Sequence, residues 1–330
     1  MKRLAIFAGY DKDNIIDDYV IFYLKELNKL ADIIYIADCE MPESELNKIK
    51  DYTIKAISER HGEYDFGSYK RGYIYAKENN ILENYDYLIL CNDSVYGPFF
   101  NFKEIVENME SKNTDFWSIF KCQKDKVDYE HYQSYFLSIT KKLFLSKEYN
   151  DFIMSIIKEK NKREIIKKYE IGLSVLFDNF KYIGASFLDS SIKENDNDNN
   201  NIPFFNPLKS IENGFPFFKI AVFNETLFTL HIDDLKKIFE YIKPYDKNII
   251  IKHLNRVIEN NKIKYLFHRF TRFKCCIINE NVINISAKYF YNGKYRILLR
   301  IFNKIQITID LPDKISYIDY GYKNFDFLRD

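Results

Sequence analysis

The sequence lacks any arrangement of cysteines that would form a disulfide framework or a zinc site. It has five cysteines, an odd number, and none of them stand in a C-x-x-C pair. No stretch approaches the roughly 18–20 apolar residues that a membrane span needs. The apolar run from Leu4 to Ala8 is too short for a signal peptide and is typical of a first β-strand. We therefore expect a reduced, cytoplasmic protein.

Several common catalytic and nucleotide-binding motifs are also absent. The sequence has no G-x-S-x-G, no P-loop and no G-x-G-x-x-G, which weakens interpretations as a hydrolase, an NTPase or a dinucleotide-binding enzyme. Its five histidines do not show the H-x-x-x-H spacing of a zinc helix. The formal net charge of +1 excludes a globally basic nucleic-acid binder, and we expect no nucleic-acid partner.

The small net charge hides a strong local asymmetry. Residues 262–304 contain ten Lys or Arg and a single acid, Glu280, so that residues 1–261 are acidic overall. One interpretation is that this basic segment attaches to an anionic membrane surface on the inner leaflet, where each cation would contribute about 1 kcal/mol. A solvated basic face is the alternative. We expect a domain at 1–260 and a basic C-terminal extension at 261–330.

Short apolar runs alternate with segments of helical periodicity, which predicts an α/β fold with a mostly parallel central sheet flanked by helices. The expected strands are 4–8, 32–37, 87–90, 116–120, 134–139, 282–286 and 305–309. The expected helices are 15–30, 43–59, 66–79, 101–111, 146–159, 162–180, 233–242 and 246–260. Such sheets bind ligands at the carboxyl ends of their strands. The candidate ligand-binding segments are therefore two strand ends, Gly9-Tyr10-Asp11 and Asn92-Asp93-Ser94.

Asp93 directly follows a predicted buried strand, where a carboxylate can point into a ligand crevice. There it could hold a divalent cation, which would in turn hold a diphosphate. Mg²⁺ commonly needs only one or two protein carboxylates. The alternative is an Asx-type turn that caps the strand-to-helix connection.

A second segment runs from Tyr64 to Gly72 and opens a predicted helix. Asp65 is a suitable N-cap, Gly67 permits a close backbone approach, and Lys70 and Arg71 add cationic donors. A helix N-terminus with nearby cations favours phosphate. An ordinary capped surface helix is the alternative.

Glu170 is the third candidate. It falls on the same helical stripe as Ile166, Leu173 and Phe177. Partial burial there would raise its pKa toward the range of a general base. Alternatively, the helix is rotated enough for Glu170 to reach solvent.

Six pieces of the sequence, taken in order from the N-terminus to about residue 255, resemble the rhamnan synthesis F family of bacterial polysaccharide glycosyltransferases. The matching pieces are 5–11 (AIFAGYD), 16–20 (IDDYV), 64–70 (YDFGSYK), 92–98 (NDSVYGP), 131–136 (HYQSYF) and 169–174 (YEIGLS). The resemblance implies a GT-A-like fold and transfer from a nucleotide-sugar donor to a surface polysaccharide or lipid-linked glycan. The donor would be a dTDP-, UDP- or GDP-sugar, with dTDP-rhamnose as the family's namesake. GT-A enzymes hold a cation, Mg²⁺ or Mn²⁺, with an Asp-x-Asp motif, and the corresponding stretch here has only one acid, Asp93.

The mechanism suggested by this resemblance is a single inverting displacement. Glu170 would act as the base, and Asp93 with its cation, or Lys70 and Arg71, would meet the charge of the leaving diphosphate. The remaining expected donor contacts are Gly9, Tyr10, Asp11, Asp65, Gly67, Asn92 and Ser94, and the expected sugar or acceptor contacts are Gln133 and Ser134. A non-catalytic nucleotide-sugar or carbohydrate-binding protein is the main alternative, and a metal-assisted hydrolase ranks after it.

Overall fold

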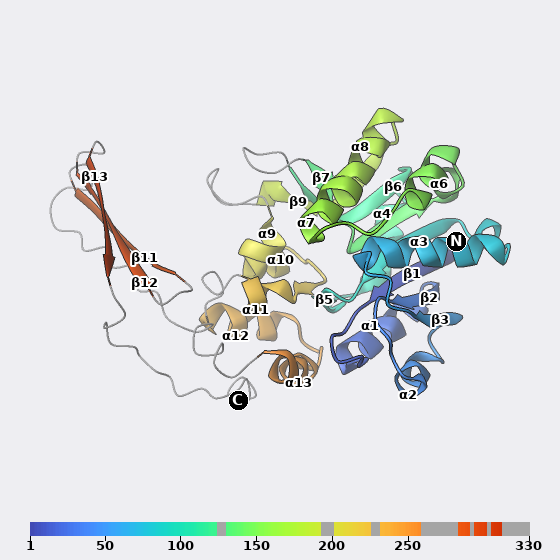
Figure 1. Cartoon of the computed structure of the whole chain (residues 1–330), viewed down its shortest axis with the longest axis horizontal. Helices are drawn as coiled ribbons and strands as arrows, with labels where there is room; N and C mark the ends of the chain where they lie inside the picture. The colour runs from blue at the N-terminus through green and yellow to red at the C-terminus, as the bar shows by residue number, and fades with distance from the viewer. Residues whose placement is uncertain are drawn as a thin grey trace.

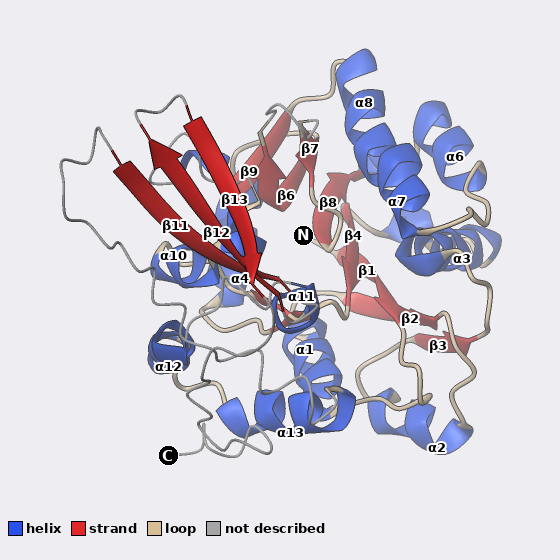
Figure 2. Cartoon of the chain, turned by 60° about the vertical axis from the view of Figure 1, so that its left-hand side comes forward, coloured by secondary structure: helices blue, strands red, loops and turns tan. Residues whose placement is uncertain are grey.

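The protein has a central sheet with helices on both faces (Figures 1 and 2). The computed structural model describes residues 1–123, 130–192, 201–225 and 232–258, and the backbone of three strands within 283–311. The eight-stranded sheet has the order β3-β2-β1-β4-β8-β6-β7, with β9 paired to β6. Its strands are β1 (Arg3–Gly9), β2 (Asp32–Ala37), β3 (Lys55–Ser58), β4 (Tyr87–Asn92), β6 (Phe116–Cys122), β7 (His131–Tyr132), β8 (Phe136–Thr140) and β9 (Gly184–Asp189).

Only β7 and β8 run against the direction of the other six strands of this sheet. The predicted α/β class with a mostly parallel sheet flanked by helices is therefore confirmed. Because β1, β2 and β4 are parallel neighbours, their carboxyl ends meet at one edge of the sheet.

Alternation along β1 explains why this strand reads as a continuous apolar run. Ala5 and Phe7 belong to one core cluster, whereas Leu4, Ile6 and Ala8 belong to the other. Since successive side chains point to opposite faces, a strand that is covered on both faces is apolar throughout.

The helices divide between these two faces. One core includes side chains of α1 (Asp18–Asn28), α4 (Phe102–Glu110), α10 (Pro207–Glu212), α12 (Ile232–Tyr241) and α13 (Lys247–Val257). The other includes side chains of α3 (Tyr64–Glu78), α5 (Lys141–Phe144), α6 (Lys147–Met154), α7 (Lys162–Ile165) and α8 (Ile171–Asn179). The remaining elements are α2 (Glu43–Leu46), η1 (Asn47–Ile49), η2 (Leu82–Asn84), β5 (Val95–Tyr96), η3 (Ile166–Glu170), η4 (Ser190–Ile192), α9 (Ile202–Phe205), β10 (Phe218–Lys219) and α11 (Ala221–Glu225).

Helix α3 lies close against β1 because Gly72 has no side chain at the contact. A Cβ at this position would lie 2.4 Å from Ile6 Cγ2, well inside van der Waals contact. This close approach holds the N-terminal end of α3 near the carboxyl end of β1.

Two predicted helices are wrong in part. Of the helix expected at 43–59, only the part that forms α2 and η1 is helical. Residues 55–58 instead form β3, which pairs with β2 from Ile34↔Lys55 to Ala37↔Ser58. This half-buried edge strand offers little apolar signal, and its backbone pairs with groups of β2 that would otherwise lack partners. The expected helix at 146–159 ends at Met154, after which residues 155–161 form a loop.

The helix expected at 162–180 is present but contains a π-helical segment, η3. A π-turn inserts one residue into the helical ladder, which rotates the residues before it relative to those after it. Glu170 stands at this break, so its direction did not follow from the regular 3.6-residue period.

At the C-terminus, β11 (Ile283–Phe290), β12 (Lys294–Ile301) and β13 (Ile305–Leu311) form an antiparallel three-stranded sheet. The predicted strands at 282–286 and 305–309 correspond to β11 and β13. The predicted domain boundary near residue 260 and the basic side chains of 262–304 lie outside the described residues. Where the chain is described, no helix is long and apolar enough to cross a membrane. Cys39, Cys91 and Cys122 are buried thiols.

Candidate functional site

A pocket of about 560 Å³ opens where β1, β2 and β4 end. Its lining comes from these strand ends, from the loop before α3, from the first turn of α3, and from the segment between α6 and α7. The lining residues are Ala8, Gly9, Tyr10, Asp38, Arg60, His61, Gly62, Tyr64, Asp65, Asn92, Asp93, Ser94, Lys158, Glu159, Lys160 and Lys162.

Asp93 is fixed against the end of β1. The backbone N–H of Tyr10 donates to Asp93 Oδ2 over 2.6 Å, and the backbone N–H of Asp93 donates to the Ala8 carbonyl over 3.2 Å. The pKa of Asp93 is raised to about 7, mainly by loss of solvation; the charges of Asp11 and Asp65 contribute to this rise, and the Tyr10 hydrogen bond opposes it. A carboxyl group with this pKa can exchange a proton near neutral pH.

Asp65 is the second carboxylate of the pocket. Burial raises its pKa to about 6, the nearby charge of Glu170 adds to the effect, and the charge of Lys162 opposes it. Asn92 Nδ2 donates to Asp65 Oδ2 over 3.0 Å. Asp65 is not the N-cap that was predicted, because α3 begins at Tyr64, two residues earlier than expected, and Glu63 stands at the cap position.

The residues present do not fit a cation site of the Asp-x-Asp kind. If Asp93 is the second acid of such a motif, Cys91 stands in place of the first. The residue between them, Asn92, has both ends of its amide engaged, because its Nδ2 donates to Asp65 and its Oδ1 accepts from the N–H and the hydroxyl of Ser94 over 3.1 and 2.6 Å. Across residues 1–123, 130–192, 201–225 and 232–258, no group of three or more His, Cys, Asp or Glu side chains could hold a metal ion.

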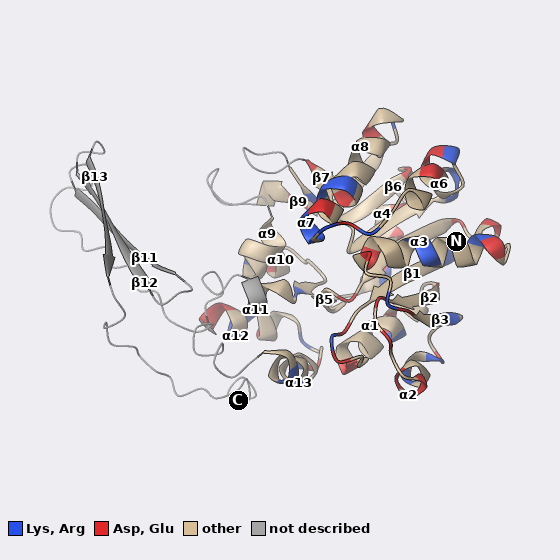
Figure 3. Ribbon diagram, in the orientation of Figure 1, with Lys and Arg blue, Asp and Glu red and all other residues tan. Residues whose placement is uncertain are grey.

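A short basic segment, residues 158–162, forms one wall of the pocket. Lys158, Lys160 and Lys162 are exposed and line it, and Figure 3 shows cationic residues gathered around α7. Glu159 also lines the pocket, but its carboxylate accepts from Lys168 Nζ over 2.8 Å and from the Tyr169 hydroxyl over 2.9 Å. The wall therefore presents net positive charge. The sequence argument missed these lysines.

The two cations predicted for phosphate binding do not line the pocket. Lys70 Nζ donates to the Ile156 carbonyl over 2.7 Å, and Arg71 donates to Glu63 Oε2 over 2.8 Å and to the Gly67 carbonyl over 3.1 Å. Gly67 gives room to a side chain instead of a ligand, because a Cβ there would lie 2.8 Å from the ring of His61.

Asp38, which sequence reasoning also missed, organises the loop before α3. Its buried carboxylate accepts the backbone N–H groups of His61, Gly62 and Tyr64 over 2.9, 2.7 and 3.2 Å. The Arg60 guanidinium donates to the Asp38 carbonyl and lies over the Tyr10 ring, 5.2 Å from its centroid. The sequence did contain a signal for Asp38, because this residue directly follows β2 in the same way that Asp93 directly follows β4.

The predicted base and acceptor residues lie outside the pocket lining. Glu170 Oε1 accepts from the N–H and the hydroxyl of Ser134, both over 2.8 Å. Gln133 is buried; it donates to Cys122 Sγ and accepts from Lys219 Nζ over 2.7 Å. Gln133 and Ser134 are buried, Glu170 is partly buried, and none of the three lines the pocket; the charge of Glu170 acts on it by raising the pKa of Asp65.

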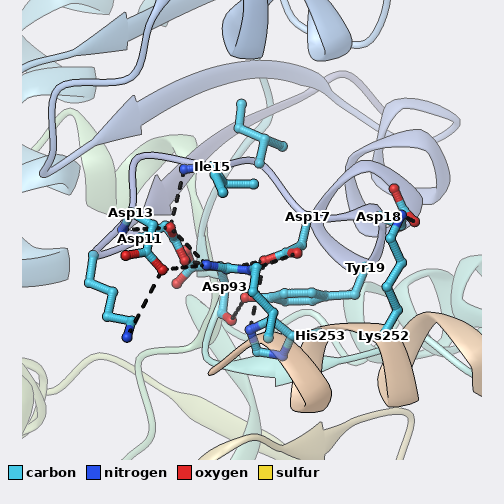
Figure 4. Close-up of polar contacts among 12 residues, drawn as sticks. Asp11, Asp13, Ile15, Asp17, Asp18, Tyr19, Asp93, Lys252 and His253 are labelled. Atoms are coloured by element: carbon cyan, nitrogen blue, oxygen red, sulfur yellow. Dashed lines mark hydrogen bonds and ion pairs between the residues drawn. The ribbon is translucent and has the colours of Figure 1, made fainter. Parts of the chain in front are cut away.

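Asp11 does not line the pocket but belongs to an ionic network, drawn in Figure 4. Arg256, near the end of α13, donates to Asp11, Asp13 and Asp17, with shortest contacts of 2.5, 2.9 and 2.5 Å. Asp11 Oδ1 also accepts the backbone N–H groups of Asp13 and Ile15. This network fixes the loop whose first residue, Tyr10, lines the pocket.

Helix α13 is also connected to Asp93 through His253 and Tyr19. The ring of His253 lies 4.6 Å from that of Tyr19, and the hydroxyl of Tyr19 donates to the Asp93 carbonyl over 3.0 Å. His253 Nδ1 also lies 2.6 Å from the Tyr96 hydroxyl. Burial lowers the pKa of His253 to about 4, so its ring is neutral at physiological pH.

Of the predicted site residues, the structure brings six together in the pocket: Gly9, Tyr10, Asp65, Asn92, Asp93 and Ser94. The others, Asp11, Gly67, Lys70, Arg71, Gln133, Ser134 and Glu170, surround it without lining it.

The family model described as rhamnan synthesis protein F matches residues 33–314. Among curated proteins, the uncharacterized protein y4gN of Sinorhizobium fredii is 23% identical over 182 residues, 55% of this chain and 46% of that protein. The virulence protein VirA of Vibrio anguillarum is 29% identical over 181 residues, 53% of this chain and 56% of that protein. The chain thus spans about half the length of the curated relatives it matches.

Among solved structures, core-mannan synthase A from Aspergillus fumigatus in its Mn/GDP form aligns with a TM-score of 0.37 at 12% identity, covering 56% of this chain and 72% of that one. A glycosyltransferase involved in glycosylation of the major capsid of PBCV-1 aligns with a TM-score of 0.32 at 10% identity, covering 58% and 82%. Likenesses this weak carry no argument about activity.

Proposed function

The chain belongs to the rhamnan synthesis protein F family, and on that premise we propose that it is a glycosyltransferase that moves a sugar from a nucleotide-sugar donor to a glycan acceptor. The observation that carries the proposal is the pocket at the carboxyl ends of β1, β2 and β4, which is lined both by carboxylates and by ammonium groups. A donor of this class has a negatively charged diphosphate, which requires cationic partners. It also has a reacting sugar, which requires a carboxylate beside it. Rhamnose as the sugar, and a surface polysaccharide or lipid-linked glycan as the acceptor, are parts of the same proposal.

In the proposed mechanism, transfer is a single displacement with inversion. The acceptor hydroxyl gives its proton to a base while its oxygen forms a bond to the anomeric carbon. The bond between that carbon and the diphosphate oxygen breaks, and the nucleoside diphosphate leaves with the electron pair. The base must lie on the side of the sugar opposite the diphosphate.

Asp93 is the group that we assign as this base. It lines the pocket, and one of its oxygens, Oδ1, accepts no hydrogen bond from the described residues. A pKa of about 7 suits a base that works near neutral pH. Glu170, the base expected from the sequence, has one oxygen engaged by Ser134 and lies outside the lining. It therefore serves as the matched comparison.

The first test identifies the donor. A thermal-shift panel of UDP-, GDP-, CMP- and dTDP-sugars should contain a ligand that stabilises the protein by mass action. That donor, incubated with oligosaccharide and lipid-linked acceptors, should then release its nucleoside diphosphate. Binding without release under any of these conditions would favour a non-catalytic binding protein.

The second test compares Asp93→Asn with Glu170→Gln. A positioned base contributes roughly 10²- to 10⁴-fold to the rate, so Asp93→Asn should lower kcat by at least about 100-fold while the donor still binds. Glu170→Gln keeps an oxygen that can accept from Ser134 and should retain most of the turnover. The opposite pattern would return the role of base to Glu170.

A further inference from the structure

We propose that Lys158, Lys160 and Lys162 bind the diphosphate of the donor, so that donor binding by this pocket does not require a divalent cation. This inference rests on the proposed function, because it assigns a part of the same pocket to a part of the proposed donor. It concerns side chains that neither the family nor the sequence motifs single out.

The three lysines stand on a segment that the fold holds in place at both ends. On one side, Ile156 is buried and its carbonyl accepts from Lys70. On the other, Asn161 caps α7 by accepting the backbone N–H of Glu164 over 3.1 Å. The lysines between and beside these anchors therefore project from an ordered rim of the pocket.

Two contacts locate the side chains more closely. Lys158 crosses over Gly62, where a Cβ would lie 3.3 Å from Lys158 Cε, and Gly62 has a positive φ of 72°. This glycine, whose backbone N–H donates to Asp38, lets the lysine lie flat against the loop before α3. Lys162 lies near enough to Asp65 for its charge to lower the pKa of that carboxyl group.

No carboxylate among the described residues forms an ion pair with these three ammonium groups. The nearest acid in the sequence, Glu159, is bound by Lys168 and Tyr169. Ammonium groups left without a partner beside a pocket attract an anion, and lysine binds phosphate as a point charge. The carboxylates of Asp65 and Asp93 repel the same anion, which places the diphosphate on the lysine wall.

The lysines take the role that a cation has in sites of the Asp-x-Asp kind. There the metal supplies the positive charge that the phosphates need. Here the place of the first acid is taken by Cys91, which is buried, the amide of the adjoining Asn92 is already engaged, and three lysines line the pocket. The lysines of the chain thus provide the positive charge that complements the diphosphate.

Calorimetry on the full chain tests this. UDP, GDP, dTDP and CDP are titrated in buffer with EDTA and again with Mn²⁺, and the matching monophosphate of the tightest binder is titrated alongside. We expect binding in EDTA, and a preference for the diphosphate over the monophosphate. The double variant Lys160→Ala/Lys162→Ala should lose about tenfold in affinity for the diphosphate, which corresponds to about 1.4 kcal/mol.

Lys167→Ala is the matched control, since Lys167 is exposed on the adjoining η3 and does not line the pocket. It should bind as the unmodified protein does. Lys158→Ala, tested separately, should weaken binding in the same direction as the double variant. All three pocket lysines are exposed, and circular dichroism and thermal melting will verify that the variants are folded.

The outcomes separate the two proposals. Binding in EDTA that is unaffected by the lysine substitutions, or binding that appears only with Mn²⁺, overturns the lysine assignment and leaves the proposed function standing. No binding of any of the four diphosphates under either condition counts against the proposed function itself, and with it against this inference.

Discussion

The ionic network around Arg256 should be a main support of the loop that forms one side of the pocket, and replacing Arg256 by Met tests this. One guanidinium serves three aspartates that stand within seven residues of one another. The side chains of Asp11 and Asp17 are only 12% and 11% exposed, whereas that of Asp13 is 48% exposed. The substitution leaves two largely buried carboxylates without their cation.

The expected cost follows from that burial. Removing one partner of a buried ion pair costs about 3–5 kcal/mol, because the other charge stays uncompensated. Arg256 keeps 22% of its side chain exposed, so water relieves part of the loss and we expect about 3 kcal/mol. The half-exposed pair with Asp13 adds less than about 1 kcal/mol.

Urea unfolding measures this change, and α13 provides a matched control. Lys252, one turn before Arg256, pairs with Asp18 over 2.6 Å, but the two side chains are 69% and 48% exposed. Lys252→Met should therefore cost less than about 1 kcal/mol. If Arg256→Met costs no more than Lys252→Met, the reasoning from burial is refuted. Arg256→Met should also weaken binding of the donor, because the loop that it holds begins at Tyr10, whereas Lys252→Met should not.

Two further predictions concern the packing of α3 and the titration of the pocket. Gly72→Ala should destabilise the protein by about 1–3 kcal/mol in urea unfolding, because the new methyl group collides with Ile6; Gly172→Ala on α8 is its control, since a Cβ there lies 3.7 Å from Phe152 and the substitution should be neutral or stabilising. The pKa of Asp93 in the folded protein, about 7, lies above its unfolded value, so ionisation disfavours the folded state and the penalty is fully present above pH 7. Asp93→Asn should therefore melt at a higher temperature than the unmodified protein at pH 8, with the difference shrinking as the pH falls toward 4, and equal melting temperatures across this range would contradict the assigned pKa.

The sequence by itself determined the elements that have a strong local signal. The strand at 32–37 was predicted with the bounds of β2, and the strand ends after β1 and β4 were identified as the ligand edge. The strand prediction succeeds because a parallel strand that is buried on both faces must be apolar throughout, and the polar residues just beyond such strands mark the edge where the pocket opens. The order of short motifs was also enough to indicate the family.

Local signals failed where a neighbour in space decides the conformation. The edge strand β3 forms because β2 offers unpaired backbone groups, and the π-turn η3 changes the direction of Glu170 in a way that a regular helical period does not contain. Lys70 and Arg71 have the composition of a phosphate site, yet the Ile156 carbonyl and Glu63 engage them.

The charges of the pocket were decided by tertiary structure alone. Lys158 lies 96 positions from Gly62, which it crosses, and Arg256 lies 245 positions from Asp11, which it binds. Burial and pairing of charges depend on which distant segments of the chain lie side by side. The same lysine or aspartate therefore takes part in a site or not according to the neighbours that the fold gives it. The sequence therefore pointed to the strand end that carries Asp93, and only the fold brought Lys158, Lys160 and Lys162 into the lining of the same pocket.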